Sequence, residues 1–492
     1  MTYGLRKSDS LIVPQKYPNK REEKPNLAED VEERGLTKGN TFKRSKDWTQ
    51  SQASLSQSLD RVRLASERRE EKLNALWHHV YNKECLRSAY YSLKRNSSCG
   101  IDRVSWSKYG KNLESNLEDL SNRLRQGGYR AHPVKRVNIP KPDGRFRPIG
   151  IPALEDKLVQ RATVEVLNAV YEGEFKNFSY GFRPGRKQHD ALDAVTVGIQ
   201  KRKINWILDA DIRGFFDALD HTMLIDFIEH RIGDKRVIRH IIKWLKAGVL
   251  EEGELKASYK GTPQGGSISP LLANIYLHYV LDLWADMWRK QNAKGDVIIV
   301  RYADDFIVGF QYKDEAHRFK AALSERLSKF KLQLHAQKTR LIEFGRFASR
   351  DRGNRGDGKP ETFDFLGFTH ICSTTRAGKF KLKRKTVSKK MICKIAQIKQ
   401  ELQKRLNDRI SEIGKWLRVV LLGHYRYYGV PGNTGSLYAF REQVLHWWYA
   451  TLKRRGQNRR IRWDNMIRIA KDWLPYPQMY HPYPSERLIV NT

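Results

Sequence analysis

Two adjacent carboxylates between two apolar runs are the feature that most constrains this chain. Asp304 and Asp305 end the tetrapeptide "YADD" and stand between "DVIIV" (296 to 300) and "FIVGF" (306 to 310). Apolar runs around a short polar turn predict a tight β-hairpin with the aspartates at its tip. Adjacent carboxylates repel one another unless a cation is present, and an oxygen-rich site of this kind suits Mg²⁺. A solvated turn is the alternative, because aspartate also favours turns through local hydrogen bonds.

A second pair of aspartates lies upstream, in "INWILDADIRGFFDALDH" (204 to 221). Trp206 and Leu208 begin an apolar strand that runs into Asp209 and Asp211, and the strand period places both carboxylates on one face. Nucleotidyl transfer by two metal ions needs carboxylates on both sides of the site, because the attacking hydroxyl and the leaving oxygen are both held by cations. A strand end and a hairpin tip on an open α/β platform would supply that arrangement.

Composition points to a polyanionic partner. The chain has 492 residues, a formal net charge of +37 and an apolar fraction of 40%, which is enough for the cores of more than one domain. A positive field of this size favours nucleic acid, whose binding is then sensitive to salt. Cysteines at 85, 99, 372 and 393 show no CxxC pairing, so neither a zinc module nor a disulfide framework is predicted. No apolar run approaches membrane-spanning length, and we expect an intracellular, soluble protein without a membrane partner.

Seven blocks of sequence resemble, in order, the polymerase blocks of bacterial group II intron-encoded reverse transcriptases and maturases. The resemblance extends from about residue 56 to the C-terminus. The blocks are "IPKPDGRFRPIGIP" (139 to 152), "SYGFRPGRKQHDAL" (179 to 192), "DADIRGFFD" (209 to 217), "GTPQGGSISPLLANIYLH" (261 to 278), "YADD" (302 to 305), "LHAQKTRLI" (334 to 342) and "FDFLGF" (363 to 368). No zinc-cysteine or His-Asn-His module is evident, so we expect no endonuclease activity.

The resemblance implies an α+β fold of right-hand polymerase architecture, in which fingers and palm with a mainly antiparallel sheet precede an all-α thumb. Residues 345 to 362, rich in glycine and charge, are expected to form an exposed loop. The implied divisions are a disordered or RNA-ordered arm (1–55), a helical N-terminal extension with the first finger helices (56–130), fingers and palm (131–375), a helical thumb or maturase domain X (376–452) and a basic aromatic tail (453–492) with possible nucleic-acid binding.

A basic amphipathic helix is predicted over 376 to 405, where Met391, Ile395, Ile398 and Leu402 recur at helical spacing among many lysines. Two further helical patterns, at about 411 to 428 and 434 to 455, would complete a three-helix thumb.

The tail beyond these helices interleaves basic and aromatic residues, in "KRRGQNRRIRWDNM" (453 to 466) and "WLPYPQMYHPYP" (473 to 484). Such a pattern can bind phosphates and stack on bases. For Trp447, Trp448 and Tyr449, which precede the tail, packing in the thumb core is favoured over a contact with nucleic acid.

The family's metal ligands can be carried over to this sequence through the matching motifs. Asp211 is the expected first metal-bridging carboxylate, with Asp209 as the second choice, and Ile212 would add its backbone carbonyl. Asp304 would be the second ligand and Asp305 a supporting one. Two Mg²⁺ ions are implied, with Mn²⁺ as an alternative.

Nucleotide-binding residues follow from the same resemblance. Phe216, five positions after Asp211, would be the steric gate that excludes a ribose 2′ hydroxyl. Lys141 and Arg147 flank a "PDG" turn and would grip the triphosphate. Gln264 and Gly265 would lie under the template and the nucleotide.

Further residues are implied on the leaving-group and primer sides. Lys338 resembles the lysine that can protonate pyrophosphate, a general-acid role. Leu366 and Gly367 would support the primer grip. Basic residues expected to bind RNA are Lys383, Arg384, Lys385, Lys389, Lys390, Arg454, Arg455, Arg459 and Arg460.

The leading functional hypothesis is an RNA-directed DNA polymerase, a nucleotidyltransferase, that also binds its group II intron RNA, assists splicing and copies the intron during retrohoming. A splicing-only maturase and a domesticated reverse transcriptase, used in antiphage defence or resembling a retron enzyme, are the alternatives. Expected partners are intron RNA, an RNA template with a DNA primer, target DNA and dNTPs, in the nucleoid-associated cytoplasm of a bacterium. The oligomeric state stays open, with a dimer as one option.

Overall fold

The computed structural model describes residues 49–68, 72–140, 146–251, 254–256, 261, 265–455 and 461–488. Most of the expected N-terminal arm, residues 1 to 48, therefore lies outside the described residues. Helix α3 (Thr49–Arg68) occupies the remainder of that range, so helical structure begins earlier than the expected position 56.

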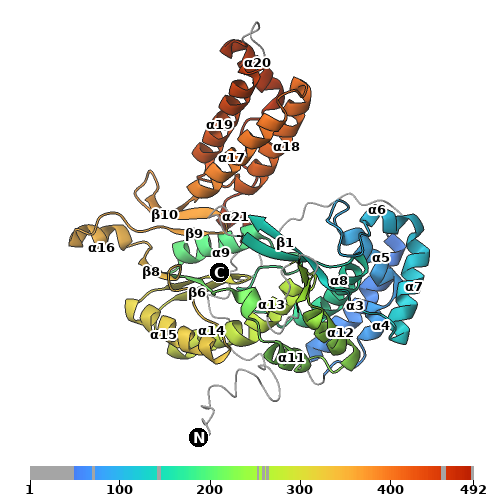
Figure 1. Cartoon of the computed structure of the whole chain (residues 1–492). Coiled ribbons are helices and arrows are strands. Elements are labelled where there is room, and N and C mark those ends of the chain that lie inside the picture. Colours follow the sequence, from blue (N-terminus) through green and yellow to red (C-terminus); the bar gives the residue numbers. More distant parts are fainter. Residues whose placement is uncertain are drawn as a thin grey trace.

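Helices dominate the N-terminal part, as the sequence predicts, and gather at the right of Figure 1. They pack around α8, which is buried along most of its length. Local signals fix individual helices: the Asn82 side chain accepts a hydrogen bond of 2.8 Å from the Glu84 backbone N–H and caps α5. The helices are α4 (Trp77–Val80), α5 (Lys83–Ser92), α6 (Trp106–Tyr109), α7 (Leu113–Gln126) and α8 (Leu154–Tyr171).

A four-stranded antiparallel sheet of order β6-β7-β3-β8 forms the centre of the molecule. Its strands are β3 (Trp206–Asp211), β6 (Val297–Tyr302), β7 (Asp305–Phe310) and β8 (Arg340–Glu343). The predicted hairpin and the predicted strand into Asp211 are both confirmed. Tyr302 and Asp211 each lie opposite Asp305 in the register, so the carboxylates meet at one end of the sheet.

Helices on both faces of the central sheet explain why β6 and β7 are buried along nearly their whole length. Such continuous apolar runs are typical of strands covered on both sides. The flanking helices are α9 (Gln188–Lys201) on one side and α14 (Leu283–Asn292) and α15 (Lys313–Lys329) on the other. Next to them lie α10 (Phe215–Ala218), α11 (His221–Glu229), α12 (Lys235–Lys246), α13 (Ser269–Leu277) and a π-helical turn (His278–Asp282).

A second sheet, of order β2-β1-β4-β5, extends beside the central one. Its strands are β1 (Val134–Pro140), β2 (Phe146–Ile151), β4 (Val249–Glu251) and β5 (Glu254–Lys256). The hairpin β1–β2 carries Arg147 opposite Ile139.

Strands β9, β10 and β11 form a three-stranded sheet of order β11-β10-β9. In this part of the chain the structure corrects two expectations from the sequence. Residues 376 to 405 do not form one helix: β11 precedes α17, because Leu382, Arg384 and Thr386 alternate into the interior at strand spacing. The expected loop at 345 to 362 contains a short exposed helix, α16, which ends at Gly356 with a φ of 75°. The elements are β9 (Phe363–Phe365), β10 (Phe368–Thr374), β11 (Phe380–Thr386), α16 (Ala348–Arg355) and α17 (Ser388–Lys404).

Four long helices form a C-terminal helical domain, here residues 388 to 473, that stands above the sheets in Figure 1. With α17 it contains α18 (Ile410–Tyr428), α19 (Thr434–Lys453) and α20 (Trp463–Trp473), so both helices expected between 411 and 455 are confirmed. Leu417, Phe440 and Trp448 are completely buried in its separate core. Trp448 therefore packs in the interior, as favoured from the sequence.

The tail folds back along this domain and ends on the central part of the molecule. A Cβ on Gly414 would come within 2.4 Å of the Trp473 ring, which shows how closely the tail packs on α18. Beyond it, α21 (Pro484–Arg487) reaches α9, where the Arg487 Nε lies 3.2 Å from an Asp193 carboxylate oxygen. The described tail is thus part of the folded structure.

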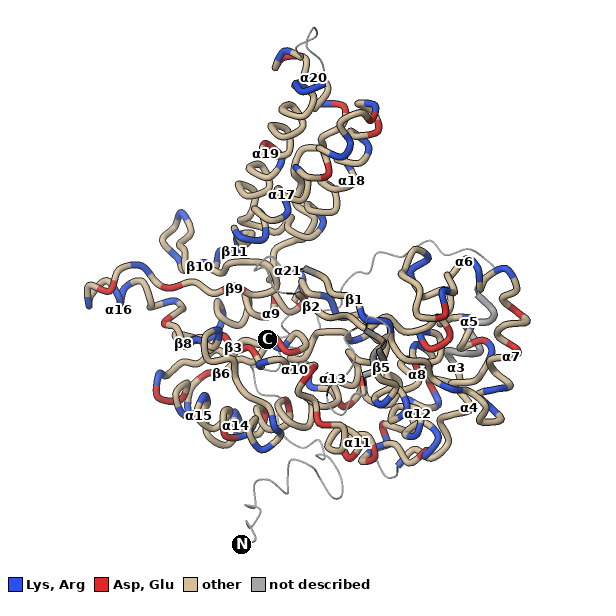
Figure 2. Tube along the Cα trace, viewed as in Figure 1, with Lys and Arg blue, Asp and Glu red and all other residues tan. Residues whose placement is uncertain are grey.

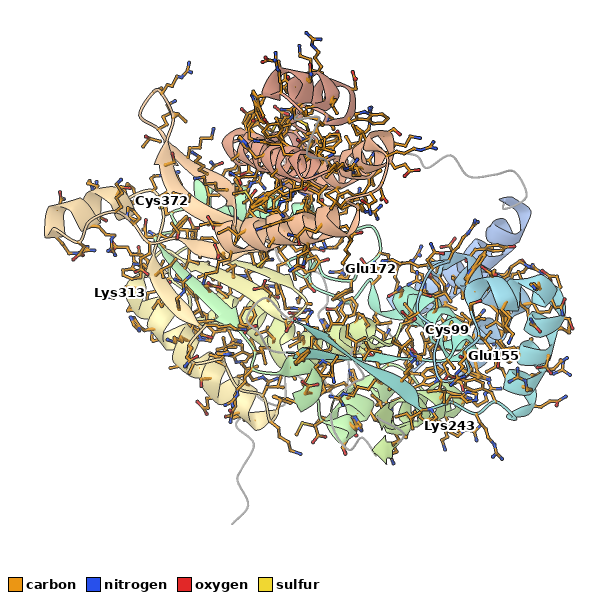
Figure 3. The ribbon with its side chains drawn as sticks, turned by 45° about the horizontal axis from the view of Figure 1, so that its top comes forward. Cys99, Glu155, Glu172, Lys243, Lys313 and Cys372 are labelled. Atoms are coloured by element: carbon orange, nitrogen blue, oxygen red, sulfur yellow. The ribbon has the colours of Figure 1, made fainter. Side chains whose placement is uncertain are left out.

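All four cysteines are free thiols, and Cys99 and Cys372 lie on opposite sides of the molecule in Figure 3. Among the described helices, none combines the length and the apolarity needed to cross a membrane.

Candidate active site

The turn that carries the two aspartates is unusually tight. Ala303 and Asp304 alone connect β6 to β7, and Ala303 has a φ of 59°, in the left-handed region that a residue with a side chain rarely adopts. Backbone strain of this kind persists only where the surrounding structure imposes it.

Gly181 packs directly against the backbone of the turn. A Cβ on Gly181 would come within 2.4 Å of the Ala303 backbone nitrogen, so no larger residue fits there. The Asn274 side-chain amide donates a hydrogen bond of 2.7 Å to the Gly181 carbonyl and so ties this segment to α13. The segment around residue 181 is consequently fixed against the hairpin tip.

Arg301 is the central group of this support, and the sequence reasoning missed it. Its side chain is completely buried and donates to both Asp282 carboxylate oxygens, at 2.6 and 2.5 Å. The same guanidinium donates to the Ala303 carbonyl at 2.9 Å and to the Asn274 side-chain oxygen at 3.1 Å. One side chain thus joins the hairpin tip, α13 and the π-helical turn. A lone arginine inside the apolar run "VIIVRY" was the signal that could have revealed it.

The carboxylates at the tip lack enough positive partners. Burial raises the pKa of Asp305 to about 8, and the charges of Asp209, Asp304 and Asp211 add to the rise. Burial also raises the pKa of Asp304, with a further contribution from Asp211. Each shift expresses the cost of holding several negative charges together away from water. A bound cation would remove that cost.

Asp209 is less suited than Asp211 to hold that cation. Burial raises the pKa of Asp209 to about 6, and the Arg340 guanidinium, 3.4 Å away, opposes the shift. Asp211 lies opposite Asp305 and contacts the exposed side chain of Lys338, whose Nζ is 2.6 Å from its carboxylate. The Asp211 side chain is 28% exposed and that of Asp209 is 16% exposed, so Asp211 is the more accessible of the two.

Two cations face the turn from separate elements. The charges of Arg147 and Lys338 both lower the pKa of Asp304 and so oppose the effect of burial. Arg147 comes from β2, and Lys338 comes from the loop before β8. The structure thus brings together five residues singled out from the sequence: Asp211, Asp304, Asp305, Arg147 and Lys338.

The donor set fits a Mg²⁺ site that is completed by substrate. Among the described residues no group of three or more His, Cys, Asp or Glu side chains is already arranged as a metal cage. Mg²⁺ does not require one, because it is usually held by one or two carboxylates together with water and substrate phosphates. Crowded oxygen donors with raised pKa values at Asp304 and Asp305 match that requirement.

Residues expected on the nucleotide side lie around the same end of the sheet. Phe216 is half-buried and packs edge-on against Phe215. The Arg213 N–H donates to the Gln333 carbonyl, and the His335 N–H donates to the Asp211 carbonyl. The Ile212 carbonyl is in neither of these two backbone hydrogen bonds.

Gly265 approaches the second sheet closely. A Cβ there would lie 2.5 Å from the Gly150 carbonyl, and its φ is 123°. Lys141 and Gln264 lie outside the described residues.

The expected primer-grip residues form the turn between β9 and β10. Leu366 has a φ of 46° and Gly367 a φ of 86°. The Tyr427 hydroxyl donates to the Leu366 carbonyl at 2.7 Å, and the Lys390 amine lies 3.6 Å from where a Gly367 Cβ would be. This turn therefore contacts both α17 and α18.

Basic residues expected to bind RNA have different surroundings. Lys385, Lys389 and Arg454 are exposed, as is Lys390. Arg384 is only 2% exposed, and its guanidinium lies 2.7 Å from Asp193, so this residue is structural in the fold and is not available at the surface.

The other expected RNA contacts are partly covered or lie beyond the description. Lys383 is half-buried, and Arg455 donates to the Arg405 carbonyl at 3.2 Å. Arg459 and Arg460 lie outside the described residues.

Comparison with known proteins agrees with this geometry. Residues 139–370, which contain the central sheet and strand β2, match the reverse transcriptase (RNA-dependent DNA polymerase) family. The chain carries a reverse transcriptase domain. The polymerase fold, with mixed helices and antiparallel sheets, is thereby established for this part of the molecule.

Relatives from several organisms share this domain. Protein YkfC of Escherichia coli is 34% identical over 237 residues, which cover 42% of this chain and 62% of that protein. The group II intron-encoded protein LtrA of Lactococcus lactis is 33% identical over 292 residues, which cover 58% of this chain and 47% of LtrA. Nuclear intron maturase 3 of Arabidopsis thaliana is 25% identical over 44% of this chain and 31% of its own length. The chain is thus homologous to intron-encoded proteins such as LtrA, and it spans about half the length of the first two relatives.

Replacement of Arg301 by methionine is expected to lower the free energy of unfolding by roughly 3–5 kcal/mol, because it leaves Asp282 buried without a partner. The double variant Arg301→Met with Asp282→Leu should recover most of that loss, since the unpaired charge is gone. Urea unfolding of both variants measures the two values. A loss below about 1 kcal/mol in the single variant would show that the buried pair does not hold the hairpin.

Proposed function

We propose that this protein is an RNA-directed DNA polymerase that binds a group II intron RNA, assists its splicing and reverse-transcribes it during retrohoming. The observation that carries the proposal is the convergence of Asp211, Asp304 and Asp305 at one end of the central sheet, beside Arg147 and Lys338. Homology to LtrA and to intron maturases supports the intron RNA as the substrate class.

In this proposal Asp211 and Asp304, with Asp305 in support, hold two Mg²⁺ ions with the triphosphate and the primer terminus. Bound divalent ions would activate the attacking 3′ hydroxyl and stabilise charge on the leaving pyrophosphate. The Ile212 carbonyl is the proposed additional donor. Mn²⁺ would serve as a substitute.

Cationic side chains would position the triphosphate and assist its departure. Arg147 can grip phosphate oxygens bidentately, and Lys141 would add a point charge. Lys338, now 2.6 Å from Asp211, would release that carboxylate to the metal and donate a proton to pyrophosphate. Gln264 and Gly265 would lie beneath the template and the nucleotide.

The C-terminal helical domain is the proposed thumb and RNA-docking surface. Lys385 and Lys389 extend a basic surface from the β10–β11 hairpin into α17, and Figure 2 shows blue segments along both. Lys390, whose charge lowers the pKa of Asp305, links this surface to the active site. Leu366 and Gly367 would hold the primer end between this basic surface and the active site.

A splicing-only maturase is the alternative that the site opposes most directly. A protein that used the fold only as a scaffold would have no need to bury Asp305 and Asp304 among like charges at a cost visible in their raised pKa values. Target DNA and dNTPs are the remaining partners of the proposed reaction, and a bacterial, nucleoid-associated location would follow from it.

The double variant Asp304→Ala with Asp305→Ala should reduce DNA synthesis on a primed RNA template to background, while RNA affinity stays within about twofold, because only the metal donors are lost. Primer extension and filter binding on the same preparation measure both. Asp314→Ala, at a carboxylate that is 74% exposed, is the matched control and should behave as wild type. Synthesis near the wild-type rate in the double variant would overturn the two-metal assignment.

Phe216→Ala should admit ribonucleotides, because loss of the ring opens space for the 2′ hydroxyl. We expect the ratio of kcat/KM for dNTP over rNTP to fall by roughly tenfold to a hundredfold. Phe216→Tyr keeps the ring volume and should retain discrimination. An unchanged ratio in the alanine variant would place the gate elsewhere.

Neutralising Lys385, Lys389 and Arg454 together with glutamine should weaken intron RNA binding and reduce its salt dependence by up to roughly one unit of log-log slope per lost phosphate contact. Extension of a short pre-annealed primer should change less, because these residues are outside the catalytic end of the sheet. RNA affinity across a salt series, splicing at low Mg²⁺ and primer extension test this.

The matched control for that variant removes the same charge from α12, far from α17 in Figure 1, as Lys235→Gln with Arg239→Gln and Lys246→Gln. If the control weakens intron binding equally, net charge and not the proposed surface determines affinity. Equal loss in all three assays for the first variant would mean that its residues are structural.

A further inference from the structure

Phe182 combines two unfavourable features at one residue. Its side chain is 53% exposed, and its φ is 57°, in the left-handed region. A bulky residue in that region is a genuine outlier, and an exposed ring gains little from burial. Folding alone therefore gives no reason for phenylalanine at this position.

Neighbouring residues impose the backbone conformation from the N-terminal side. The Tyr180 N–H donates to the Arg301 carbonyl at 2.8 Å, and the Gly181 carbonyl accepts from Asn274 at 2.7 Å. A Cβ on Gly181 would collide with the backbone of Ala303. The chain thus enters Phe182 already fixed against the catalytic turn.

On the C-terminal side, a buried arginine fixes the backbone next to Phe182. Arg183 is 5% exposed, and its guanidinium donates to the carbonyls of Lys176 and Ser179 at 2.7 and 2.8 Å. It also donates to the Glu172 carboxylate at 3.0 Å, and Figure 3 labels Glu172 in the region below the C-terminal helical domain. Phe182 is therefore held outward between two anchored neighbours. Strain of this kind is characteristic of functional sites.

The exposed ring lies beside the active site. Its centroid is 6.1 Å from that of Tyr302, the residue immediately before the Ala303-Asp304 turn. The two rings form an aromatic edge next to the catalytic carboxylates. In a polymerase the primer terminus must lie at those carboxylates, so nucleic acid is what an exposed ring at this place would meet first.

We propose that Phe182 packs against a nucleoside of the template–primer duplex beside the primer terminus and so positions the duplex on the catalytic carboxylates. Aromatic rings bind nucleosides through their π-faces without base-specific hydrogen bonds, which suits an enzyme that copies any sequence. Phe182 is a positioning residue, not a catalytic one. The inference rests on the proposed polymerase function.

The variant Phe182→Gly separates a binding role from a structural one, because glycine removes the ring and also relieves the left-handed backbone. We expect its Tm to equal or exceed that of wild type, while its Kd for a dideoxy-terminated DNA primer on an RNA template rises roughly tenfold. Fluorescence anisotropy of the labelled duplex gives Kd without any synthesis. Phe182→Trp should keep the wild-type Kd.

Arg103→Gly is the matched control, because Arg103 is exposed, has a φ of 52° and lies among the N-terminal helices. It should also raise or keep Tm and leave the Kd of the duplex unchanged. A lower Tm for Phe182→Gly, or an unchanged Kd, would overturn the inference. Primer extension by wild type in parallel tests the polymerase function separately, so failure of that function and failure of the Phe182 contact are distinguishable.

Discussion

The buried ion pair between Arg301 and Asp282 is the interaction on which the candidate active site depends. It lies beneath the hairpin tip and holds, through one guanidinium, a strained carbonyl at Ala303 and the side chain of Asn274. Burying two charges is costly, and apolar residues of similar volume often stabilise a fold as well or better. What the pair contributes is geometry: through the Ala303 carbonyl it fixes the turn that carries Asp304 and leads into Asp305.

The surface carries mainly positive charge, whereas the candidate site carries mainly negative charge. The chain as a whole carries +37, and Figure 2 shows basic residues spread over the helical domain and the N-terminal helices. The end of the central sheet at the hairpin turn instead concentrates carboxylates, and the pKa values of Asp209, Asp304 and Asp305 are raised there. In the proposed reaction the outer field would attract a polyanion, and a divalent cation would offset the repulsion where that polyanion meets the carboxylates.

The sequence predicts correctly those elements in which the period of the apolar residues is undisturbed. The hairpin around Asp304 and the helices α18 and α19 were predictable because apolar residues alternate or recur cleanly there, whereas helix α20 was not predicted. Strand β11 was not, since the lysines that alternate with its inward residues hid the strand period that turns Arg384 inward. Arg301 and Phe182 escaped for a related reason: their importance lies in contacts with residues distant in sequence, and a lone arginine in an apolar strand or a phenylalanine in a loop has no pattern of its own.

Binding of Mn²⁺, followed by electron paramagnetic resonance in the complex with dNTP and a dideoxy-terminated primer on RNA, tests the central claim most directly. The account predicts that wild type binds Mn²⁺ and that Asp211→Asn loses it. Asp209→Asn should retain Mn²⁺, because in wild type the Asp209 carboxylate lies 3.4 Å from the Arg340 guanidinium and is not a metal ligand in this account. Equal binding by wild type and Asp211→Asn, or loss in Asp209→Asn alone, would contradict the assignment of the metal site.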